Sequence, residues 1–145
     1  MPMLGESPGF TTQPVVVDLN TVGDTFVPVP FDGYIVRRMV IFGVSTTLAA
    51  SSTTVGAYTA AAAGGSLIST PATKTGLTAF NKFLDCTIAS PATTDILTPT
   101  AYTPANGGPT QYGLYVRVGV VHGSAATLRC AFELQAAPPL ATVNA

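Results

Sequence analysis

The stretch LYVRVGVVHGSAATLRCAFEL, residues 114–134, carries the clearest fold signal in the chain. Its two halves each place apolar side chains at alternate positions, and a Gly-containing segment separates them. Because side chains alternate between the two faces of a β-strand, each half predicts a strand with one apolar face. The two apolar rows are Leu114, Val116, Val118 and Val120, followed by Ala126, Leu128, Cys130, Phe132 and Leu134.

We expect these two strands to pair as a hairpin around His122-Gly123-Ser124. A loop with an odd number of residues is needed to keep both apolar rows on one face. A three-residue loop would place Arg117 opposite Arg129, an unfavourable pair of like charges. The sequence therefore predicts a five-residue loop from His122 to Ala126, with Arg117 opposite Ala131.

Short segments of strand-forming composition fill most of the remaining chain. Pro28 and Pro30 place the segment 25–31 at the edge of a sheet, since proline cannot donate to a ladder. Residues 61–65, three alanines and two glycines, and residues 102–111 are expected to be loops. Short strands joined by Gly, Pro, Thr and Ser predict an all-β fold, an antiparallel β-sandwich with a jelly roll as the favoured topology. The other expected strands are 15–19, 34–43, 53–60, 66–69, 78–80, 83–88 and 95–98.

The composition of the two ends divides the chain into three parts. Residues 1–14 predict an N-terminal arm, residues 15–135 the β-sandwich domain, and residues 136–145 a C-terminal tail. We expect the arm and the tail to become ordered against neighbouring molecules. The arm and the uncharged loops are the expected contacts to a partner.

The strand YIVRRMVIFG, residues 34–43, is apolar on both of its faces, which predicts that both are covered. Strand alternation would point Arg37 and Arg38 to opposite faces. At least one of them then lies near buried surface, in an ion pair or at a subunit interface. The interface is the favoured interpretation for both residues.

Charged residues make up 9% of the chain, against about 25% in typical soluble domains. The low charge predicts either a neutral Thr-rich surface or a surface covered by partner subunits, because interface cores are depleted of charge. The net charge of −1 argues against nucleic acid as a partner. The charge-free stretch from Met39 to Thr73 is interrupted by Ser, Thr and Gly, so we expect no membrane span. The first residues lack the pattern of a signal peptide.

The residues that usually carry catalysis or bind metals are sparse and scattered. His122 is the one histidine, and we interpret it as a turn residue. Zinc is not expected, because Cys86 and Cys130 are far apart and have no partner His. Both are interpreted as free buried thiols, with a disulfide as the alternative. The Asp18 to Asp24 cluster is interpreted as turn chemistry rather than a calcium site. The sequence therefore predicts no enzyme, no cofactor and no metal.

Two stretches resemble small virion proteins of tailed bacteriophages. They are VGAYTAAAAGGSLI, residues 55–68, and LYVRVG, residues 114–119, followed by Gly123 and the Ala125-Ala126-Thr127 run. The low charge and the Ala, Thr and Gly content are similar to those of head decoration, or cement, proteins. The resemblance implies a protein made in the host cytoplasm that binds the major capsid protein on the outside of the virion, often as a trimer, and stabilises the shell.

The alternative function is a jelly-roll module that binds a carbohydrate or receptor on a phage tail or a cell surface. Such sites use aromatic platforms with polar neighbours. Tyr102, Tyr112 and Tyr115, close to Asn106-Gly107-Gly108, are the candidates for such a platform.

Overall fold

The strand β10 (Thr127–Ala136) organises one of two antiparallel sheets in the computed structural model, which describes residues 9–89, 92 and 95–137. In sheet A, β10 pairs on one side with β4 and on the other with β1 and β2 in succession. Sheet A therefore holds β10 together with β1 (Gly9–Thr11), β2 (Val15–Asp18), β4 (Tyr34–Phe42) and β7 (Phe83–Cys86).

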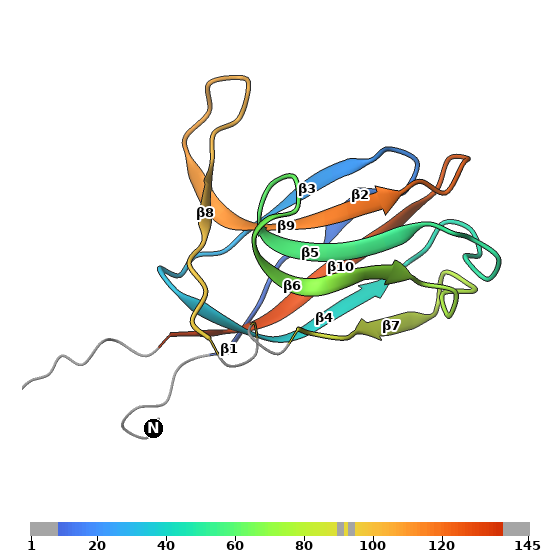
Figure 1. Cartoon of the computed structure of the whole chain (residues 1–145), viewed down its shortest axis with the longest axis horizontal. Coiled ribbons are helices and arrows are strands. Elements are labelled where there is room, and N and C mark those ends of the chain that lie inside the picture. The colour runs from blue at the N-terminus through green and yellow to red at the C-terminus, as the bar shows by residue number, and fades with distance from the viewer. Residues whose placement is uncertain (1–8, 90–91, 93–94, 138–145) are drawn as a thin grey trace, which may run out of the picture.

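The strand β9 (Gln111–Val120) has the same central place in sheet B. It pairs with β3 along one side, and with β5 and then β8 along the other. The remaining strands of sheet B are β3 (Gly23–Pro28), β5 (Thr54–Ala60), β6 (Gly64–Thr73) and β8 (Thr100–Tyr102). The two sheets form two layers, and the hairpin from β8 to the start of β9 projects from one end (Figure 1).

The interior between the sheets is filled by the inward rows that the alternation predicted, except for Val120, which is 46% exposed. Both sheets contribute fully buried side chains to one core cluster. The expected all-β sandwich is thus confirmed, and β3 lies at a sheet edge as its prolines predicted. The finer expectation of a jelly roll is not confirmed by this strand order. Among the core side chains are Met39, Ile41, Leu128 and Phe132 from sheet A, and Val55, Ile68, Leu114 and Val116 from sheet B.

The predicted hairpin of residues 114–134 is wrong. β9 and β10 lie in different sheets, and Arg117 is opposite Asp24 of β3 and Gly56 of β5 rather than Ala131. The backbone of the buried Leu19 accepts a hydrogen bond from His122 N–H and donates one to Ala126, so the connection changes sheets around this residue. The alternation pattern shows which side chains face inward. The pattern is the same whether two strands pair in one sheet or face each other across the core.

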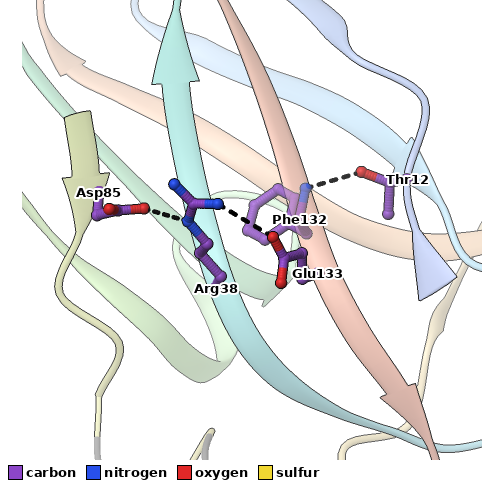
Figure 2. Close-up of polar contacts among 5 residues, drawn as sticks. All are labelled: Thr12, Arg38, Asp85, Phe132 and Glu133. Carbon is purple, nitrogen blue, oxygen red and sulfur yellow. Dashed lines mark hydrogen bonds and ion pairs between the residues drawn. The ribbon is translucent and has the colours of Figure 1, made fainter. Parts of the chain in front are cut away.

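Part of the segment expected as an arm belongs to sheet A. β1 pairs with β10, and residues 1–8 lie outside the described residues. Between β1 and β2, the buried Thr12 forms two hydrogen bonds with Phe132. Thr12 N–H donates to Phe132 O at 2.9 Å, and its Oγ1 accepts from Phe132 N–H at 2.9 Å (Figure 2). The Thr12 hydroxyl thereby supplies the acceptor that a paired strand would provide, in the gap between the end of β1 and the start of β2. At the other terminus, Ala136 belongs to β10 rather than to a tail.

Among the shorter expected elements, residues 78–80 do not form a strand, and neither do residues 95–98, where Leu97 forms only an isolated bridge with Tyr34. The residues 102–111 form a loop that is closed at its base, because Tyr102 of β8 pairs with Gln111 of β9. Asp18 accepts hydrogen bonds from Asn20 N–H at 2.8 Å and from the Thr21 hydroxyl at 3.0 Å, which confirms turn chemistry there.

The β5–β6 turn holds two alanines in a left-handed conformation. The backbone φ is 58° at Ala62 and 61° at Ala63, and Gly64 N–H donates to Ala61 O at 3.0 Å. Two left-handed central residues are typical of type I′ hairpin turns, where Asn-Gly is preferred. Asp24 stabilises this turn by accepting from Ala62 N–H at 2.9 Å, and it also pairs with Arg117 at 3.1 Å.

Replacing these alanines by Asn-Gly (A62N/A63G) is expected to raise the free energy of unfolding by about 1 kcal/mol. Each left-handed L-residue costs about 1–2 kcal/mol, and part of that gain is offset by the greater freedom of glycine in the unfolded chain. Urea denaturation measures the change. Ala125→Gly, in an exposed loop without a positive φ, is the control and should lower stability. A less stable A62N/A63G variant would contradict the turn geometry.

Thr12→Val should lower the free energy of unfolding by about 1–3 kcal/mol, because it leaves the buried N–H of Phe132 without its acceptor. Thr11→Val, at an exposed position of β1, is the matched control and should change stability by less than about 0.5 kcal/mol. Equal effects of the two substitutions in thermal or urea unfolding would show that the Thr12 hydroxyl has no special role.

Candidate interaction surface

The outer face of sheet A carries a mostly apolar row of side chains that runs across four strands, with Arg129 of β10 as its one charged member. Register places Val16 of β2 beside Arg129, Arg129 beside Phe42 of β4, and Phe42 beside Phe83 of β7. Val16 is 58% exposed and Phe83 62%. We call the outward-facing side chains of β2, β10, β4 and β7, together with Phe80, the sheet A face.

Phe80 extends this row just before β7. It is 66% exposed, and a Cβ placed on Gly43 would lie 3.8 Å from its ring and 3.6 Å from Cδ of Arg129. Phe80 and Arg129 therefore both border Gly43, next to Phe42. Large exposed apolar side chains gathered on one flat sheet are typical of an interaction surface rather than of scattered surface residues.

A charged cluster adjoins the apolar row. The Arg38 guanidinium lies between Asp85 of β7 and Glu133 of β10, with Nε bonded to Asp85 and Nη1 at 3.1 Å from Glu133 (Figure 2). It also lies 5.8 Å from the centre of the Phe83 ring, within the range of a cation–π contact. The hydrogen bonds that Arg38 donates to Asp85 and to Glu133, in that order of size, raise the pKa of Arg38 above its ordinary value. The cluster fixes an ionised, well-ordered group at the border of the apolar row.

Arg37 lies on the same outer face, so the expectation that Arg37 and Arg38 point to opposite faces is wrong. The pairing of β4 with β10 shifts between Glu133 and Leu134, which leaves Arg37 as an extra residue in a β-bulge. Its Nε donates to Gln135 Oε1 at 2.8 Å. The ion-pair alternative holds for Arg38, and an interface role for both arginines stays a prediction.

The expected covering of both faces of residues 34–43 is half correct. The inward side chains are fully buried, whereas Ile35, Val40 and Phe42 on the outer face are partly exposed. The described part of the chain therefore covers one face of β4 and leaves the other, which belongs to the sheet A face, open to a partner.

The three tyrosines proposed as one platform are divided by the fold. Tyr102 stacks on Phe26 with ring centres 4.7 Å apart, and Phe26 meets the buried Tyr115 edge-to-face at 5.4 Å. These rings stabilise one another at the base of the projecting hairpin. Tyr112 is not part of this cluster. It follows the parity of the inward side chains of β9 and lines two cavities together with Val29 and Pro30, which follow β3.

His122 makes a contact that sequence reasoning missed. Its Nδ1 lies 2.7 Å from the hydroxyl of Ser51, which also accepts from Thr53 N–H at 3.1 Å. Ser51 and His122 are 71 positions apart in the sequence, so no local sequence pattern predicts this contact. The pair ties the loop before β5 to the β9–β10 connection, in keeping with the interpretation of His122 as a turn residue.

The two cysteines are free and buried, as expected. Burial raises the pKa of the Cys86 thiol, and it raises the pKa of the Cys130 thiol well above the ordinary value. The buried Lys74 ammonium lowers both pKa values in part, and it also forms a hydrogen bond with Cys86. Within the described residues, no three His, Cys, Asp or Glu side chains form a group able to hold a metal ion. The same part of the chain contains no helix long and apolar enough to cross a membrane.

In the folded protein at pH 8, both thiols should react with a disulfide reagent roughly a hundredfold or more slowly than in guanidinium, because thiolate formation needs local opening. Cys130 should be the slower of the two, since it is fully buried and its pKa is raised more. Mass spectrometry of alkylated peptides separates the two sites. Fast labelling of Cys130 in the native state would contradict its burial.

Comparison with known proteins adds no relative: no protein family, curated protein or solved structure matches the chain.

Proposed function

We propose that this protein is a virion structural protein that binds the outer surface of a phage capsid and stabilises the shell. The observation that carries the proposal is the sheet A face, where Val16 and Phe83 on the sheet and Phe80 just before β7 are each more than half exposed. The proposed partner is the major capsid protein, and a trimer is the proposed assembly.

The physical character of the sheet A face supports this function. A β-sheet supported by a packed core presents its side chains in a fixed arrangement, which limits the entropy lost on binding. The apolar row supplies area to bury, and the adjacent Arg38 cluster supplies a polar border, as in typical protein interfaces.

The low charge of the chain also supports a lattice-bound role. Contacts that depend little on Coulomb attraction are only weakly affected by salt. If the protein forms a trimer, binding at several neighbouring positions adds avidity even when each contact is weak. A shell-wide coat of a small, rigid protein would then hold neighbouring capsid subunits together.

Phe83→Glu should weaken binding to capsids that lack the protein by about tenfold or more, because an apolar contact would be lost and a carboxylate would be buried in the interface. The measurement is copies per particle by quantitative mass spectrometry, scaled to the major capsid protein, over a range of protein concentrations. The unsubstituted protein should saturate at hundreds of copies.

Val120→Glu is the matched control. Val120 is 46% exposed and lies in sheet B, so its substitution should leave the copy number unchanged. Circular dichroism establishes that both variants fold. Unchanged binding by Phe83→Glu would remove the sheet A face as the contact. Saturation at a few dozen copies would indicate a tail or neck position, and absence from particles would remove the virion function.

A further inference from the structure

Arg129 is the one charged side chain in the apolar row of the sheet A face. Register places it between Val16 of β2 and Phe42 of β4, and Phe83 of β7 continues the row. Its Cγ and Cδ lie where a side chain on Gly43 would contact them, so glycine at that position leaves room for the Arg129 stem. Residue 129 is itself exposed. Arg129 therefore stands within the row and not at its border.

Arg129 also differs from the other arginines of the chain in having no bonded partner. Within the described residues, no hydrogen bond, ion pair or ring contact engages its side chain. Asp18 lies diagonal to it on β2, but the Asp18 carboxylate accepts from Asn20 N–H and the Thr21 hydroxyl. The other arginines each bond to a side chain of the same molecule: Arg37 to Gln135, Arg38 to Asp85 and Glu133, and Arg117 to Asp24.

A partner that covers the apolar row must also cover Arg129. A charge that loses its water without gaining a bonded opposite charge costs more than the surrounding apolar contacts return. The planar guanidinium presents its N–H donors in a fork that matches a carboxylate. A surface that offers a carboxylate at this point removes the cost, and a purely apolar surface is rejected.

We propose that the partner of the sheet A face presents an aspartate or glutamate carboxylate to Arg129, surrounded by apolar side chains that bury Val16, Phe42 and Phe83. This inference rests on the proposed function, because it takes the sheet A face as the contact with the major capsid protein. The apolar row supplies the area that is buried. The ion pair fixes the register of the two surfaces and makes Arg129 the residue that determines specificity.

Binding of full-length variants to capsids that lack the protein tests the ion pair, with copies per particle measured against protein concentration. Arg129→Gln should weaken binding about thirtyfold or more, because it leaves the carboxylate of the partner buried and unpaired. Arg129→Lys keeps the charge but loses the fork, so it should weaken binding less. Lys82→Gln removes the same charge from an exposed position just before β7, and this matched control should bind as the unsubstituted protein does.

A carbodiimide, which joins an amine directly to a carboxylate, identifies the partner group. In capsids carrying the Arg129→Lys protein, it should form an amide bond between residue 129 and an Asp or Glu of the major capsid protein, found by mass spectrometry of the linked peptides. Replacing that acid by Lys should weaken binding of the unsubstituted protein and restore binding of Arg129→Glu. Circular dichroism establishes that each variant folds.

The outcomes separate this inference from the function on which it rests. Weaker binding by Phe83→Glu with unchanged binding by Arg129→Gln would overturn the ion pair and leave the proposed function standing. Unchanged binding by both variants would remove the sheet A face as the contact, and the ion pair with it. Equal losses from Arg129→Gln and Lys82→Gln would show a general effect of net charge and overturn the pair. So would an Arg129→Lys protein that binds capsids but couples to no carboxylate.

Discussion

The packing of the inward row of β9 against the inward row of β10, across the interior, is the constraint on which the rest of the structure depends. Each strand is the central member of its own sheet, so every other strand is placed by pairing directly with one of them or with a neighbour of one of them. Burying both rows in one core provides the main stabilisation of a sandwich. The chain must therefore change sheets between residues 121 and 126, and the backbone of Leu19 forms the hydrogen bonds that make this crossing compatible with a buried interior.

The demands on β10 explain the local irregularities of sheet A. Its free side must be paired by two short strands, and Thr12 supplies both hydrogen-bonding groups at the break between them. Its other side meets β4 through a bulge, which turns Arg37 and Arg38 to the same outer face. Bulges commonly redirect a side chain. Here the result is that the charge of Arg38 is balanced by Asp85 and Glu133 at the edge of an apolar row.

The molecule thus leaves large apolar side chains exposed on the outer side of sheet A. The sheet A face is the outer side of a sheet whose inner side forms the core, so it is available to another molecule without any change in the fold. A partner protein that binds there would bury apolar side chains without disturbing the core.

The alternation of apolar residues by itself predicted the all-β sandwich, most of the core side chains and the burial of both cysteines. The prolines of the segment 25–31 predicted that this segment lies at a sheet edge. These are properties of single strands, because strand periodicity and proline chemistry act within a few residues. The tertiary structure alone decided which strands pair and where the bulge at Arg37 lies. It also decided the separation of Tyr112 from Tyr102 and Tyr115, and the Ser51–His122 contact. Each depends on residues far apart in the chain, and an inward-facing row carries the same pattern whether its partner lies beside it or across the core.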